Sequence, residues 1–91
     1  MNTAPAMHTL LVVDDDHDIR TLLAEQLGRA GYQVLTAADG VQMRQQMERE
    51  RVDLVVLDLN MPGEDGLTLC RNLRAQSATP VIMLTARAEP I

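Results

Sequence analysis

The sequence contains no lysine, tryptophan or phenylalanine, and one tyrosine is its only aromatic residue. A hydrophobic core must therefore be built from aliphatic side chains, methionine and cysteine. All eight basic residues are arginines, and they face thirteen acidic residues, which gives a formal net charge of -5. Because a net-acidic segment repels the phosphodiester backbone, we expect no direct nucleic-acid binding by this segment.

The sequence also lacks a pair of cysteines for a disulfide and an apolar run long enough to span a membrane. The single cysteine, Cys70, excludes an internal disulfide and fits a reducing compartment. No apolar run approaches the ~20 residues that cross a bilayer. Residues 1–8 lack the basic start and apolar stretch of a signal peptide, and we expect them to form a disordered tail. The sequence therefore predicts a cytoplasmic protein that makes no use of a membrane.

Short apolar runs alternate with segments of helical periodicity. Strands are predicted over residues 9–13, 33–37, 53–57 and 80–84, most of them apolar enough to be buried on both faces. The first helix, over residues 17–30, carries an apolar stripe at Ile19, Leu22, Leu23, Leu27 and Ala30. A second helix opens at Asp39, and a third has the stripe Leu67, Cys70 and Leu73. This alternation indicates a parallel sheet with helices on both faces, which is a three-layer α/β fold.

Three polar residues, Asp14, Asp58 and Thr85, directly follow predicted strands. Because parallel strands share a direction and neighbours lie ~4.8 Å apart, these side chains are expected at one edge of the sheet, close enough to share a ligand. With Asp15, the edge gathers three carboxylates, whose mutual repulsion favours a divalent cation such as Mg2+. Such a cation also neutralises a phosphoryl group in transfer. Asp58 is the best-placed nucleophile for an aspartyl phosphate, and Thr85 is placed to bond a phosphoryl oxygen.

Three segments carry a resemblance to a known family: LLVVDDD (10–16), LVVLDLNMPGEDGL (54–67) and PVIMLTA (80–86). They resemble the signature strand ends of response regulator receiver domains, in the same order. The segment NMPGEDGLTLCRNLR (60–74) is most similar to the OmpR-type subgroup, whose members carry a C-terminal winged-helix DNA-binding domain. The resemblance implies a flavodoxin-like, CheY-like receiver fold over residues 9–91, acting in signalling and not in the turnover of an external substrate.

The resemblance also implies a role for each residue of the acidic edge. Asp58 would receive a phosphoryl group from a sensor histidine kinase with the help of Mg2+. Asp15 would contact the cation directly, Asp14 through a water molecule, and Asn60 through its main-chain carbonyl. The Thr85 hydroxyl would respond to the ~1.5–2 negative charges added at Asp58 and so switch an output, which the OmpR-type likeness makes transcriptional.

The family pattern continues beyond what this sequence contains. It includes a further strand, two more helices and a lysine that contacts the phosphoryl group, whereas this sequence ends at Ile91 without any lysine. We therefore expect a receiver domain that is incomplete after its fourth strand. That strand would leave an edge that is apolar on both faces, from which we expect self-association as a dimer, with exchange of elements as one route.

Two other classes of function stay open. The first is a hydrolase with an aspartyl nucleophile, but haloacid-dehalogenase-like enzymes need a second aspartate where this chain has Asn60. Nucleotide-binding enzymes fit less well, since the glycine-rich phosphate-binding motifs are absent. The second is a receiver-like interaction module that is never phosphorylated, an alternative that the missing lysine supports. Taken alone, three consecutive aspartates are usually a turn or a helix cap, and Asp16 is expected to be such a cap.

Overall fold

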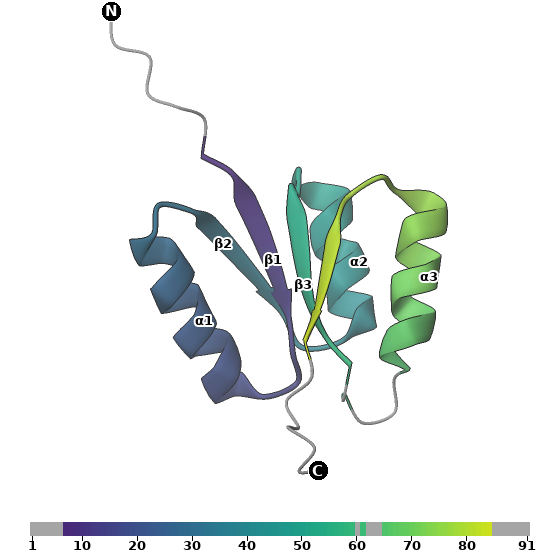
Figure 1. Ribbon diagram of the computed structural model, residues 1–91, viewed down its shortest axis with the longest axis horizontal. Coiled ribbons are helices and arrows are strands. Elements are labelled where there is room, and N and C mark those ends of the chain that lie inside the picture. The colour runs from purple at the N-terminus through teal and green to yellow at the C-terminus, as the bar shows by residue number, and fades with distance from the viewer. Residues whose placement is uncertain (1–6, 60, 62–64, 85–91) are drawn as a thin grey trace, which may run out of the picture.

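The structure is a computed structural model, and it describes residues 7–59, 61 and 65–84. Four parallel strands form one sheet in the order β2-β1-β3-β4. Their bounds are β1 Thr9–Val13, β2 Gln33–Ala37, β3 Leu54–Asp58 and β4 Val81–Leu84. The helices are α1 His17–Arg29, α2 Gly40–Arg49 and α3 Gly66–Gln76. Helix α1 lies on one face of the sheet and helices α2 and α3 on the other (Figure 1), which confirms the predicted three-layer α/β fold.

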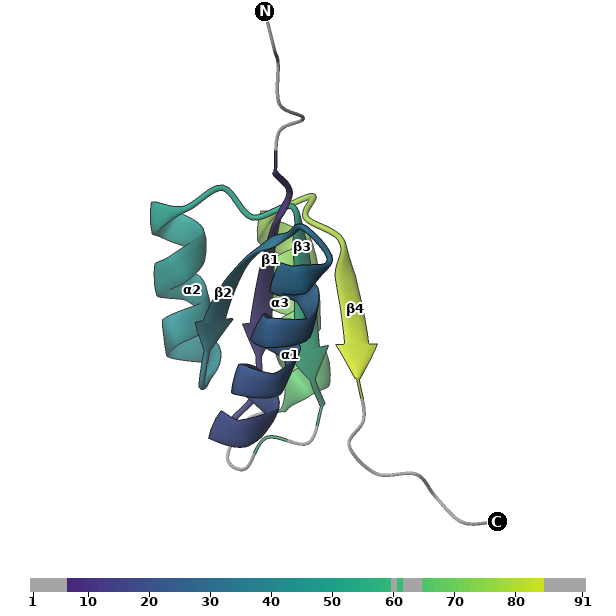
Figure 2. The ribbon, with the colours of Figure 1, turned by 90° about the vertical axis from the view of Figure 1, so that its left-hand side faces the viewer.

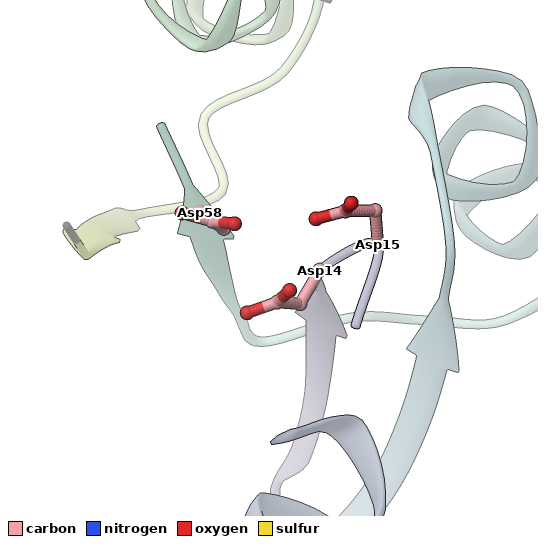
Figure 3. A group of neighbouring side chains, drawn as sticks. All are labelled: Asp14, Asp15 and Asp58. Atoms are coloured by element: carbon pink, nitrogen blue, oxygen red, sulfur yellow. The ribbon is translucent and has the colours of Figure 1, made fainter. Parts of the chain in front are cut away.

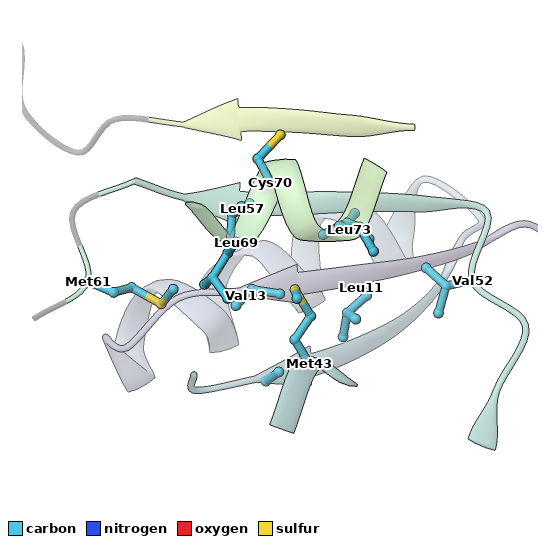
Figure 4. Close-up of a cluster of buried hydrophobic side chains, with 11 residues drawn as sticks. Leu11, Val13, Met43, Val52, Leu57, Met61, Leu69, Cys70 and Leu73 are labelled. Atoms are coloured by element: carbon cyan, nitrogen blue, oxygen red, sulfur yellow. The ribbon is translucent and has the colours of Figure 1, made fainter. Parts of the chain in front are cut away.

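The main hydrophobic core lies between the sheet and helices α2 and α3 (Figure 4). Side chains alternate between the two faces of a strand, so that every second residue of β1 and β3 points to these helices. Burying one such aliphatic side chain stabilises the fold by ~1.5–3 kcal/mol. The buried members of this core are Leu11, Val13, Ala37, Met43, Val52, Val55, Leu57, Met61, Leu69, Cys70 and Leu73.

The opposite face of the sheet is less completely covered. Helix α1 lies over the first two strands, and Leu10 and Val12 of β1 are buried there. Strand β4 stands beside α1 without such cover (Figure 2), and its residues Ile82 and Leu84 are 49% and 38% exposed. Among the residues of α1 itself, none is fully buried. The packing of the described part of the molecule is therefore one-sided.

Each helix begins at an aspartate whose side chain accepts main-chain hydrogen bonds. Asp16 accepts from the amides of Asp18 at 2.8 Å and Ile19 at 3.3 Å. Asp39 accepts from the amide of Gln42 at 2.8 Å, so both predicted caps are confirmed. The third cap, Asp65, accepts from the amide of Leu67 at 3.1 Å. No helix in the described ranges is long and apolar enough to cross a bilayer.

Several details of the sequence prediction were wrong, including the start of β4, which begins at Val81 and not at residue 80. Strand β3 begins at Leu54 and includes Asp58, which pairs with Leu84 of β4, whereas the strand was expected over residues 53–57. The stripe of α3 is also shifted, since Leu67 is 54% exposed while Leu69 is buried beside Cys70 and Leu73. Two residues assigned to the stripe of the first helix are exposed: Leu22, and Ala30, which caps the helix after its last residue, Arg29. The predicted tail falls almost entirely outside the described residues.

Candidate metal centre

The carboxylates of Asp14, Asp15 and Asp58 converge at the carboxyl ends of β1 and β3. These strands are neighbours, and their register pairs Val13 with Leu57, so the residues that follow lie side by side. One carboxylate oxygen from each aspartate lies within 4.8 Å of the others, and the side chains point into a shared space (Figure 3). From β1 the chain turns to β2 on one side, while β3 lies on the other, and ligands of open α/β sheets bind at such a switch point.

The three carboxylates differ in their exposure to solvent. Asp14 and Asp58 are only 5% and 4% exposed, whereas Asp15 is exposed. Burial raises the pKa of Asp14, the hydrogen bond from the Asp16 amide lowers it, and the nearby charges of Asp58, Asp15 and Asp16 raise it further. The net result is a raised pKa, which means that the ionised form of Asp14 lacks compensating positive charge. A bound cation would supply that charge.

Asp14 is held in place through all of its polar groups. Its amide donates to the carbonyl of Ala37 at 3.1 Å, which extends the contact between β1 and β2. Its carboxylate accepts from the amide of Asp16 at 2.9 Å, and its main-chain carbonyl accepts from Nη1 of Arg20 at 2.7 Å. Sequence reasoning did not identify Arg20. The available signal was an arginine one turn into the helix that follows the acidic residues.

Asp58 is held from the β4 side and from α3. It pairs with Leu84, and the amide of the next residue, Leu59, donates to the Leu84 carbonyl at 2.9 Å. Gly66, the first residue of α3, lies so close that a Cβ atom there would be 2.7 Å from the Cα of Leu59 and 3.3 Å from the carbonyl oxygen of Asp58. Only glycine allows this approach, and the contact holds the main chain at Asp58 and Leu59 in place.

The remaining predicted site residues are Asn60 and Thr85. Both lie outside the described residues, so their assigned roles stay predictions. Thr85 directly follows Leu84, the last residue of β4, and Asn60 is two residues beyond Asp58. The structure therefore brings together three of the five predicted site residues.

The three carboxylates suit a hard divalent cation. Carboxylate oxygens are the ligands that Mg2+ prefers, whereas Zn2+ and copper ions favour imidazole or thiolate. At Mg2+–oxygen distances of ~2.1 Å, two ligands on opposite sides of the ion are ~4.2 Å apart. The oxygens here lie within 4.8 Å of one another, so a small side-chain rotation, or one water molecule between ion and carboxylate, brings them into coordinating range. The residues present therefore fit the ion.

Comparison with known proteins identifies the family of this chain. The family profile described as "Response regulator receiver domain" matches residues 10–91. A curated relative, the uncharacterized transcriptional regulatory protein YrkP of Bacillus subtilis, is 45% identical over 84 residues, which is 92% of this chain and 36% of YrkP. Two further curated relatives, PhoP of Bacillus subtilis and AfsQ1 of Streptomyces coelicolor, are also named as transcriptional regulatory proteins, and the chain spans about a third of the length of these relatives.

Solved structures show the same fold. The chemotaxis protein CheY4 of Vibrio cholerae superposes with a TM-score of 0.84 and 39% identity, covering 93% of this chain and 73% of CheY4. The response regulator TrrA of Thermotoga maritima, solved in complex with Mg2+-BeF, gives a TM-score of 0.82 and 38% identity over 90% of this chain and 72% of TrrA. The sheet order and helix placement described above are thus those of a CheY-like, flavodoxin-like fold.

Proposed function

This chain belongs to the response regulator receiver domain family of two-component signalling, and from that premise we propose that Asp58 is the residue that accepts the phosphoryl group. The observation that carries the proposal is the convergence of three carboxylates within 4.8 Å. Asp58 is the member that stands alone at its strand end, and it is held by β4 and by the close approach of Gly66. A carboxylate whose main chain is held in this way, next to two further carboxylates, suits a nucleophile.

We propose that Mg2+ is held by Asp14, Asp15 and Asp58, with the main-chain carbonyl of Asn60 as a further ligand. Asp15 is exposed and is assigned to direct contact, while the buried Asp14, already bonded to the Asp16 amide, is assigned to contact through water. When bound, the cation neutralises negative charge on the carboxylates and on the phosphoryl group. The TrrA structure, which was solved with Mg2+-BeF, supports this choice of ion.

The phosphoryl donor is proposed to be a sensor histidine kinase. An oxygen of the Asp58 carboxylate attacks phosphorus, the P–N bond of a phosphohistidine breaks, and the histidine nitrogen leaves with the electron pair and takes up a proton. The product is an aspartyl phosphate on this chain. We expect only this self-phosphorylation and its reversal by hydrolysis, and no turnover of another substrate.

The output is proposed to be transcriptional. Three curated relatives, YrkP, PhoP and AfsQ1, are named as transcriptional regulatory proteins, and this chain corresponds to about a third of their length. Added charge at Asp58 would draw in the Thr85 hydroxyl and bias the neighbouring surface between two states. We assign the receiver domain to residues 9–91, the preceding residues to a tail, and the protein to the cytoplasm, where a buried free Cys70 is maintained.

Self-association is proposed to occur at strand β4. Its residues Ile82, Met83 and Leu84 are exposed large hydrophobic side chains on the last strand of the described sheet. An apolar edge strand with unpaired main-chain groups is a template for another strand. A second copy of the chain, whose β4 is equally exposed, is the proposed occupant, with exchange of elements as one route.

The phosphoacceptor proposal is tested with a small acyl phosphate and Mg2+. We expect intact-mass measurement to show one phosphoryl adduct on the wild-type chain and none on Asp58→Asn. The control is Asp18→Asn, which removes one exposed carboxylate from α1 and should leave the adduct in place. Continuous turnover of phosphate esters would favour the hydrolase alternative, and no adduct together with no cation binding would favour the interaction module.

A further inference from the structure

We propose that Arg20 is a positioning residue that fixes the direction in which Asp15 is presented to the metal ion. The inference rests on the proposed metal centre but concerns a residue outside it. Arg20 lies near the beginning of α1, and its Nη1 donates to the main-chain carbonyl of Asp14 at 2.7 Å in a partly buried contact. The link therefore joins the helix directly to the turn that carries both acidic residues.

The accepting carbonyl belongs to the peptide group that joins Asp14 to Asp15. A peptide group is planar, so a bond that fixes its carbonyl oxygen also fixes the amide nitrogen and Cα of the next residue. The Asp15 side chain is attached to that Cα, so the position of the Cα sets the direction in which the side chain starts. Arg20 thus acts on Asp15 through the main chain, without touching its carboxylate.

Asp15 has little else to direct it. Within the described ranges, no hydrogen bond or ion pair is formed by the Asp15 carboxylate, which is exposed. Asp14, in contrast, is bonded through its amide to Ala37 and through its carboxylate to the Asp16 amide. Loss of the Arg20 bond would leave Asp14 with two of its three anchors, whereas Asp15 would lose the contact that orients its peptide group.

Two other roles for Arg20 predict different results. If Arg20 only fastened α1 to β1, its loss would lower the free energy of unfolding without changing cation affinity. If it acted through its positive charge near the carboxylates, it would repel a cation, and its loss would tighten binding. Positioning alone predicts weaker cation binding when the bond is removed.

The test uses Mn2+ alone as the probe, with free Mn2+ measured by electron paramagnetic resonance. We expect Arg20→Met to weaken Mn2+ binding by about tenfold, in the range found for residues that orient metal ligands. Arg20→Gln keeps an N–H donor without the charge and should bind Mn2+ more tightly than Arg20→Met. Arg29→Met, which makes the same charge change at the other end of α1, should bind like the wild type.

Equal or tighter Mn2+ binding by Arg20→Met would overturn the proposal, as would identical affinities of the Gln and Met variants. Circular dichroism first establishes that each variant is folded. A second readout, the amide resonance of Asp15 in metal-free protein, should move in Arg20→Met and stay in Arg29→Met. If the wild type bound no Mn2+, the metal centre itself would be refuted, while an unmoved Asp15 resonance would refute the positioning role.

Discussion

The two faces of the sheet are built from similar aliphatic residues but are covered to different extents. On the α2 and α3 side, Leu57 and its neighbours in the core are buried, although Met83, the β4 residue paired with Leu57, is 42% exposed. On the α1 side, β1 is buried but β4 exposes Ile82 and Leu84. Since both faces are apolar, the sequence of each strand alone does not reveal this difference. We infer that stability is concentrated on one face and that the other, together with the β4 edge, is available for contact.

The largest expected effect comes from truncating one residue on each face. Leu57→Ala and Ile82→Ala remove the same number of carbon atoms, but Leu57 is fully buried and Ile82 is half exposed. We expect Leu57→Ala to lower the free energy of unfolding by ~2–5 kcal/mol and Ile82→Ala by less than ~1 kcal/mol. Urea unfolding measures both. Equal losses would show that the two faces contribute alike.

A smaller difference is expected between the free energies of local unfolding of helices α1 and α3. Helix α1 has no fully buried residue, whereas α3 buries Leu69, Cys70 and Leu73. Amides of α1 should therefore exchange with solvent at lower opening free energies than those of α3. A difference of roughly tenfold in protection corresponds to ~1.4 kcal/mol. Hydrogen exchange followed by NMR tests this, and slower exchange in α1 than in α3 would contradict the one-sided packing.

At the carboxyl ends of β1 and β3, a similar contrast exists between a buried residue, Asp14, and an exposed one, Asp15. The raised pKa of Asp14 means that the native state binds its proton more readily than the unfolded chain. Protonated Asp14 therefore adds to the free energy of unfolding below the ordinary carboxyl pKa, and this stabilisation is lost as the pH rises through the raised pKa. Asp14→Asn keeps an oxygen for the Asp16 amide and removes the buried charge.

We therefore expect metal-free Asp14→Asn to be more stable than the wild type at neutral pH, and the gain to disappear in acid. The gain should be smaller than the loss in Leu57→Ala, because one partly compensated charge is removed. Urea unfolding with a chelator at several pH values measures it. Asp15→Asn serves as the exposed control, and an equal gain in that variant would contradict the assignment of the effect to burial.

The smallest effect on stability, with the clearest effect on assembly, is expected at the β4 edge. Ile82→Lys places a charge on the exposed face and should change the free energy of unfolding by less than ~0.5 kcal/mol. It should nevertheless reduce self-association measured by light scattering. Val41→Lys, at an exposed position of α2, is the matched control. Unchanged self-association in Ile82→Lys would remove β4 from the proposed interface.

The fold and the acidic edge were predictable because continuous apolar runs end abruptly at aspartates. Asp14 and Asp58 follow directly from that pattern and from the shared direction of parallel strands. The exposure of Leu67 was not predictable from its helical spacing, because Leu67 shares the spacing of Cys70 and Leu73, which are buried. Arg20 was missed because its place one turn into the helix was the only sequence signal, while its bond to a main-chain carbonyl is visible only in the structure. Asn60 rests on resemblance alone, whereas Thr85 was also predicted from its place directly after a strand.

The close approach of Gly66 to Leu59 has a consequence for how this site tolerates change. The smallest possible side chain, a single methyl group, would lie 2.7 Å from the Cα of Leu59 and 2.9 Å from its Cδ2 atom, and the Leu59 side chain can move but its main chain cannot move without shifting the strand end. The end of β3 or the start of α3 would then have to shift, carrying Asp58 with it. The alignment of the Asp58 carboxylate therefore depends partly on the missing side chain of a residue at the start of helix α3.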